Sequence, residues 1–140
     1  MRLVWFLFLI VPFAAGIAKA APHYSKPEVR REITAVVEAQ LAAFRADNLA
    51  GAYGFAATPL RARLTLEQFA VMMARGYPLI LHHARAELGL PVDDGGWATI
   101  VVRVSIADGT SAAYRYHLLK EAAGWRIAGV DLEQTHEADA

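Results

Sequence analysis

The C-terminal third of the chain decides the fold, because it contains three runs rich in β-branched and aromatic residues. These runs are Trp97–Ile106 (WATIVVRVSI), Ser111–Lys120 (SAAYRYHLLK) and Trp125–Leu132 (WRIAGVDL). Asp108-Gly109 separates the first two, and this dipeptide is a strong hairpin signal because a two-residue type I′ loop needs positive φ at both positions. A second turn is expected at Ala122–Gly124. The stretch therefore predicts a three-stranded antiparallel meander.

The other end of the chain has the three marks of a secretory signal peptide. Arg2 gives a basic start, Leu3–Ala15 is an apolar run, and Ala18–Ala20 (AKA) is a small-residue cleavage site. An uncleaved membrane anchor is the alternative, but a spanning helix needs about 20 apolar residues and this run is shorter. We therefore expect residues 1–20 to be removed by cleavage after Ala20. The mature protein would be exported, to the periplasm or outside the cell, with no membrane segment left.

The composition predicts one domain, residues 21–140, that is held together by packing alone. Of the 140 residues, 56% are apolar, which is enough for a sizeable core, and the chain has no cysteine to form a disulfide. Removal of Arg2 and Lys19 with the signal leaves 12 basic and 14 acidic residues. This slightly acidic balance argues against nucleic-acid binding, since a phosphate backbone needs a cationic surface.

The segment after the signal peptide is expected to begin with a long amphipathic helix that ends near Ala46. Ser25–Glu28 fits a capping box, in which the serine and glutamate side chains satisfy free backbone N–H groups. Apolar residues then recur every three to four positions, as one buried face of a helix requires. They are Val29, Ile33, Val36, Val37, Leu41 and Phe44.

Two shorter helices and one more strand complete the expected elements. Asp47-Asn48 can cap a second helix, and Thr65–Gln68 is a capping-box pattern that begins a third helix ending at Gly76. We expect Leu60–Leu64 to be a connector and Leu79–Leu88 to be the first strand of the sheet. Helices followed by strands, without alternation, indicate an α+β fold. The prediction is three N-terminal helices packed on a curved antiparallel sheet of about four strands.

Several segments together resemble a family of small exported bacterial proteins of unknown function. They are Gln40–Asp47, Tyr53–Ala56, Gly76–Pro78, Tyr114 and Gly124–Val130. That family is grouped with the nuclear transport factor 2-like (ketosteroid isomerase-like) superfamily. The resemblance spans roughly residues 38–132 and implies a cone-shaped (cystatin-like) fold with a pocket where the cone opens. It implies no activity.

The expected hairpins bring three polar residues into one row. If Asp108-Gly109 is a two-residue loop, Arg103 lies opposite Tyr114, and if Glu121–Gly124 is a four-residue loop, Tyr114 lies opposite Asp131. Directly opposed residues lie about 4.5 to 5.5 Å apart at Cβ. Such a row could orient a small polar or anionic ligand, although a structural salt bridge at the rim of the sheet is the alternative.

The same register assigns the two faces of the sheet. The inner face would carry Trp97, Val101, Tyr116, Leu118 and Ile127. The outer face would also be apolar, and an exposed apolar patch normally marks an interface, so it suggests a homodimer. Its residues would be Ala98, Ile100, Val102, Val104 and Ile106, with Ala113 and Leu119 beside them.

Two further residues are candidates at the mouth of the cone. Arg45 follows the apolar stripe of the first helix, and we expect it to contact Asp47 or Asp131. Tyr77 is expected to line or fill the pocket. No metal or other cofactor is expected, because adjacent side chains such as those of His82-His83 point to opposite faces of a strand and cannot share one ion.

Two functions remain open. The preferred hypothesis is a non-catalytic domain that binds a small ligand or associates with itself or a partner. The alternative is an enzyme of the isomerase, dehydratase or hydrolase kind that is found among the cone-fold proteins this chain resembles, with Asp47 or Asp131 as the base and Tyr114 as the hydrogen-bond donor. The sequence has no nucleophile elbow and no glycine-rich phosphate loop to support other chemistry.

Overall fold

The computed structural model describes residues 21–136. The predicted signal peptide and the predicted cleavage site after Ala20 lie outside the described residues, so export stays a prediction. Within residues 21–136 no helix combines the length and the apolar character that crossing a membrane requires.

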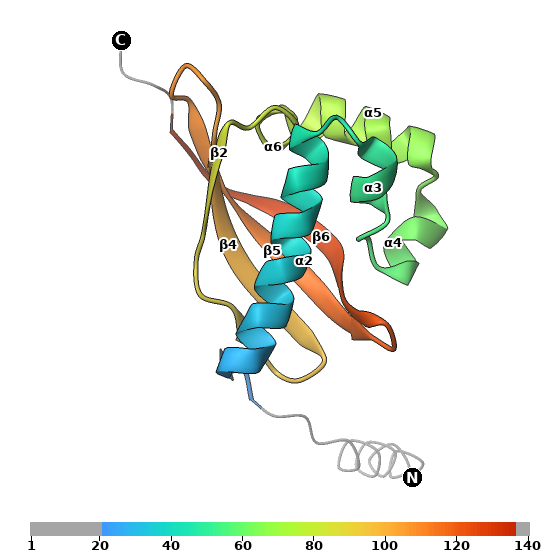
Figure 1. The fold of residues 1–140 in the computed structure, drawn as a ribbon, viewed down its shortest axis with the longest axis vertical. Coiled ribbons are helices and arrows are strands. Elements are labelled where there is room, and N and C mark those ends of the chain that lie inside the picture. The colour runs from blue at the N-terminus through green and yellow to red at the C-terminus, as the bar shows by residue number, and fades with distance from the viewer. Residues whose placement is uncertain (1–20, 137–140) are drawn as a thin grey trace, which may run out of the picture.

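The described chain is a mixed α+β structure in which five helices come before most of a six-stranded antiparallel sheet. Figure 1 shows α2 lying across one face of the sheet, with α3, α4 and α5 beside it. The helices are α2 (Pro27–Arg45), α3 (Leu49–Tyr53), α4 (Thr58–Arg63), α5 (Leu66–Gly76) and α6 (Pro78–Leu81). The strands are β1 (His23–Tyr24), β2 (Arg85–Leu88), β3 (Val92–Asp93), β4 (Trp97–Ser105), β5 (Ser111–Glu121) and β6 (Gly124–His136).

The sheet is built around the predicted meander β4–β5–β6. Its order is β1-β3-β4-β5-β6, and β2 also pairs with β4. The short strands β2 and β3 share the edge of β4 that β5 leaves free. The sheet has six strands rather than about four, because it also contains β1 and β3. These two strands have two residues each, and His23 and Tyr24 of β1 pair with β3. Periodicity cannot reveal strands this short.

Most of the predicted helix signals act as expected. The Thr65 side chain accepts from the Gln68 N–H and the Gln68 side chain accepts from the Thr65 N–H, so this capping box is complete. Asn48 caps α3 by accepting from Gly51. The first capping box is wrong, because the Ser25 hydroxyl instead donates to Asp93 in β3 and α2 begins without a side-chain cap.

Two connections are helical where extended chain was expected. The expected connector at residues 60–64 is largely helix α4, and residues 78–81 form α6, so the strand expected from Leu79 begins only at Arg85. Each helix has a proline in its first turn, Pro59 in α4 and Pro78 in α6. Proline is favoured there, because its fixed φ suits a helix and its missing N–H costs no hydrogen bond.

The predicted register of the first hairpin is wrong by one residue. The Ile106 N–H donates to Thr110 O at 3.0 Å, and Gly109 has φ +96°, so three residues rather than two form the loop. A shift of one residue changes the partner of every residue in the strand. Arg103 therefore lies opposite Ala113, and Val101 lies opposite Arg115 instead of Tyr116.

The inner and outer faces of β4 are consequently the reverse of those expected from the sequence. The residues of β4 that were expected on an exposed apolar face belong to the core, while Trp97 is 48% exposed on the other face. This removes the basis for a homodimer through that apolar patch. The four residues of the patch that lie in β4, all buried, are Ala98, Ile100, Val102 and Val104.

A β-bulge in β6 decides where Asp131 lies. Lys120 pairs with Trp125 as predicted, but His117 pairs with Gly129 while its neighbour Leu118 pairs with Ile127. Ala128 is therefore an extra residue, and Asp131 lies opposite Arg115 rather than Tyr114. Such a bulge moves all following residues of a strand by one position relative to the partner.

The bulge adjoins a backbone contact between the helical layer and the sheet. The Ala57 N–H donates to Ile127 O at 2.8 Å, and the Ile127 N–H donates to Phe55 O at 2.9 Å. Ala56 and Ile127 form a parallel bridge between these bonds. The connection after α3 is thus attached to the edge of β6.

Candidate functional site

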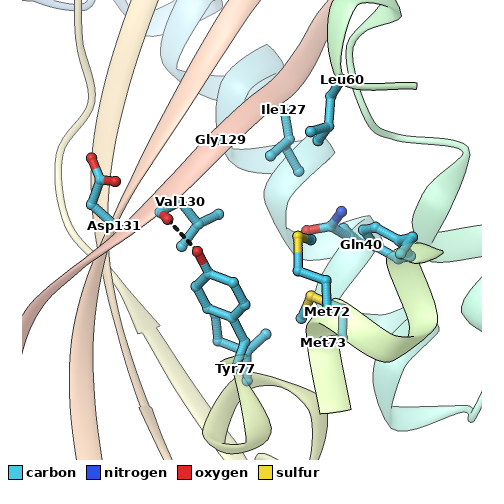
Figure 2. A pocket seen from close by; sticks show the side chains of 11 residues that line it. Gln40, Leu60, Met72, Met73, Tyr77, Ile127, Gly129, Val130 and Asp131 are labelled. Carbon is cyan, nitrogen blue, oxygen red and sulfur yellow. Dashed lines mark hydrogen bonds between the residues drawn. The ribbon is translucent and has the colours of Figure 1, made fainter. Parts of the chain in front are cut away.

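The candidate site is a cavity of about 230 Å³ between the helical layer and β6. Figure 2 shows Tyr77 and Val130 on one side of it and Gln40 with two methionines on the other. The lining is mostly apolar and comes from α2, α4, α5, the start of α6 and β6. It comprises Gln40, Leu60, Phe69, Met72, Met73, Tyr77, Ile80, Ile127, Gly129, Val130 and Asp131.

Gln40 is the buried polar residue of this lining. It lies on α2 among the apolar residues that face the core, and only 4% of it is exposed. Its Nε2 donates to Ala52 O at 3.1 Å, which ties α2 to α3. Because a backbone carbonyl only accepts, this bond also fixes which end of the amide is nitrogen.

Tyr77 closes the opposite side of the cavity. Its hydroxyl donates to Val130 O at 2.8 Å, so it joins the α5–α6 corner to β6 (Figure 2). Burial raises the pKa of Tyr77, and the negative charge of Asp131 raises it further. The hydroxyl therefore stays protonated and keeps donating at neutral pH.

Two buried tyrosines of β5, Tyr114 and Tyr116, lie near Tyr77. The ring of Tyr114 packs against that of Tyr77 with 5.9 Å between centroids. Burial raises the pKa of Tyr114, and the electrostatic interaction with Tyr77 raises it further. Tyr116 is fully buried, and burial also raises its pKa. Its hydroxyl has no hydrogen-bond partner among the described residues. Neither ring lines the cavity.

Asp131 lies at the rim, but its carboxylate is turned to the outer face of the sheet. His117 Nε2 lies 2.7 Å from its Oδ2, and the pair is exposed. Figure 2 shows the carboxylate pointing away from the Tyr77 hydroxyl. A second ion pair, between Arg115 and Glu133 at 2.8 Å, is also exposed and lowers the pKa of Glu133.

A comparison of the sequence with models of protein families gives a match. The family model described as "Domain of unknown function (DUF4864)" matches residues 26–140, which include every helix and strands β2 to β6. The chain belongs to the DUF4864 family. This agrees with the expected kinship to proteins of unknown function. A comparison with curated proteins found no match.

The predicted polar row does not exist in this DUF4864 domain. Tyr114 faces Val102 and Leu132, Arg103 faces Ala113 and Glu87, and Asp131 faces Arg115. The loop that is one residue longer and the bulge at Ala128 together separate the three side chains. Of the five candidate residues, the structure brings Tyr77 and Asp131 to the cavity and packs Tyr114 against Tyr77.

Arg45 makes a contact that the sequence did not suggest. Its Nη1 lies 2.9 Å from His83 Nε2, so the expected contact with Asp47 or Asp131 is wrong. His83 Nδ1 lies 2.7 Å from Ile80 O, a pure acceptor, so Nδ1 carries the hydrogen and Nε2 accepts from the guanidinium. His83 is thus held in its neutral form, with 5% of its surface exposed.

This contact predicts a pH-dependent loss of stability. Burial lowers the pKa of His83 and the Arg45 charge lowers it further, against the opposing hydrogen bond to Ile80. As the pH falls below about 6.5, the unfolded chain takes up the proton before the folded chain does, so the free energy of unfolding decreases by up to about 1.4 kcal/mol per pH unit until the folded pKa is reached.

Urea unfolding between pH 7.5 and 5 measures the effect. We expect the decrease to be smaller in His83→Gln than in the wild type, and unchanged in the control His82→Gln, whose side chain is exposed. Equal pH profiles for the wild type and His83→Gln would contradict a neutral, buried His83.

Gln40, Met72 and Met73 line the cavity but were not among the site residues expected from the sequence. Gln40 gave a usable signal, because it lies seven residues after Ile33 and four before Phe44, in phase with the apolar stripe of α2. A polar residue in that phase is either bonded inside the core or directed into a cavity. Among residues 21–136 no three His, Cys, Asp or Glu side chains are placed to hold a metal ion together.

Proposed function

We propose that this DUF4864 domain binds a small, predominantly apolar molecule in the cavity between α2, α5 and β6. The supporting observation is the cavity itself, with its volume of about 230 Å³ and its apolar lining. This volume exceeds the ~150 Å³ of an engineered cavity that binds benzene and falls below the ~300 to 1,000 Å³ of drug-sized sites. The ligand would therefore be about the size of a single substituted ring.

The lining also favours an apolar ligand over the anionic one first expected. Arg103 and Arg45, the two candidate cations, do not line the cavity. Met72 and Met73 do, and unbranched methionine side chains adapt to ligands of different shape. An anion would lose its hydration there without gaining a positive partner.

The same geometry gives no support to the catalytic alternative. Asp47 lies in a different surface hollow with Arg45 and His83, and the Asp131 carboxylate bonds to His117 outside the cavity. A general base must come within hydrogen-bond reach of its substrate. Binding without chemistry is therefore the function that we propose. The proposed kinship with the nuclear transport factor 2-like superfamily is supported by the position of α2 across the sheet (Figure 1).

Methionine methyl NMR tests the proposal directly. The chain has three methionines, and two of them, Met72 and Met73, line the cavity. In protein labelled with ¹³C at the methionine methyl groups, toluene is expected to shift both signals in a saturable manner and to raise the melting temperature. Signals that stay in place up to the solubility limit of toluene would contradict the proposal.

Two tryptophan variants of α5 provide the matched control. Met72→Trp places a larger side chain in the cavity and is expected to weaken toluene binding at least about tenfold, measured on Met73. Val71→Trp adds a similar ring at the preceding residue, which is exposed and outside the cavity. It should leave toluene binding unchanged. Equal weakening by both variants would indicate an effect on the fold rather than on the cavity.

A further inference from the structure

Gln40 has a carbonyl oxygen that the protein itself does not use. Its Nε2 donates to Ala52 O, so Oε1 takes no part in this bond. Within residues 21–136 the amide makes no other hydrogen bond. The residue is 96% buried, as its 4% exposure shows, and it lines the cavity. Oε1 is not among the fully enclosed polar atoms of the described chain that lack a partner, so it is open to the cavity.

The surroundings of this oxygen are apolar. Met72 and Met73 lie beside Gln40, and Tyr77 on the other side already donates its hydroxyl hydrogen to Val130 O (Figure 2). Among the described residues that line the cavity, Asp131 alone is charged, and its carboxylate bonds to His117. A charged ligand would therefore be buried without a counter-ion. A neutral ligand needs none.

We infer that the cavity selects neutral ligands that carry one hydrogen-bond donor, such as a phenol or a small alcohol, and that the donor bonds to Gln40 Oε1. This inference rests on the proposed binding function and specifies its ligand class. The apolar body of the ligand would contact the methionines. Its hydroxyl would donate a hydrogen bond to the free amide oxygen, which an apolar ligand of the same size cannot do.

Phenol and toluene form a matched pair of probes, because they differ only in a hydroxyl and a methyl group on the same ring. Both are titrated into the wild type and into Gln40→Met, which keeps the side-chain length and removes the amide. We expect the ratio of phenol affinity to toluene affinity to fall about tenfold in the variant, the effect of one buried hydrogen bond. An unchanged ratio would overturn the inference.

The wild-type protein gives a second readout in case Gln40→Met, which also loses the bond to Ala52, does not fold. The side-chain ¹⁵N–¹H signals of Gln40 are expected to shift more with phenol than with toluene. Equal shifts would overturn the donor assignment while leaving ligand binding in place. If neither probe moves these signals or the methionine methyl signals, the proposed function itself fails, so the two failures are distinguishable.

Discussion

Val102→Asp is expected to prevent folding, whereas Val101→Asp is expected to leave the domain folded. Val102 is fully buried in the core, opposite Tyr114, so the new carboxylate would have neither water nor a positive partner. Burial of an unpaired charge is among the few changes that cost more than about 4 kcal/mol. Val101 lies on the outer face opposite Arg115, where a carboxylate stays hydrated. Soluble yield and circular dichroism measure the difference.

Alanine variants at the same two positions keep the test quantitative. In urea unfolding, Val102→Ala is expected to lower the free energy of unfolding by about 2 to 4 kcal/mol, because truncation of a buried side chain leaves a cavity. Val101→Ala is expected to lower it by less than about 1 kcal/mol. Similar losses at both positions would show that β4 does not have the face assignment described above. The comparison therefore tests the register on which the whole site depends.

Phe69→Ala is expected to lower the free energy of unfolding by about 3 to 5 kcal/mol. The ring is 2% exposed and packs between Phe44 and Tyr53, with centroids 6.2 and 5.4 Å away. It also lines the cavity, so its removal enlarges the space available to a ligand. Urea unfolding with and without toluene measures both effects, since a ligand that binds only the folded state stabilises it.

The control for this prediction is Val71→Ala on the same helix. Val71 is 51% exposed, and its truncation is expected to change stability by less than about 0.5 kcal/mol. Toluene should recover more stability in Phe69→Ala than in the wild type. A loss below about 1 kcal/mol in Phe69→Ala would mean that the ring does not hold α5 against α2 and α3.

Local signals in the sequence predicted the elements that depend on local interactions. The apolar spacing of α2, the Thr65 capping box and the Asn48 cap all involve residues within a few positions of one another, and the structure confirms each. The two turns of the meander were also located correctly. Their positions follow from Gly109 and Gly124, which both have positive φ.

The pairing register of the strands could not be predicted from such local signals. One extra residue in the Gly109 loop reversed the assignment of β4, whose inner and outer positions are both rich in apolar residues. The polar residues of β4 indicate its outer face more clearly, because Thr99, Arg103 and Ser105 all lie at alternate positions on that face. The bulge at Ala128 adjoins a contact with Phe55 and Ala57, about seventy residues earlier, and no local pattern encodes such a contact.

The attachment of Ile127 to the connection after α3 makes the two sides of the cavity unequal in strength. On that side, two backbone hydrogen bonds join the helical layer to β6. On the other side, the Tyr77 hydroxyl bond to Val130 O joins the α5–α6 corner to the same strand. We therefore expect the two layers to separate more readily at Tyr77, and a ligand of the proposed cavity to enter and leave at this corner.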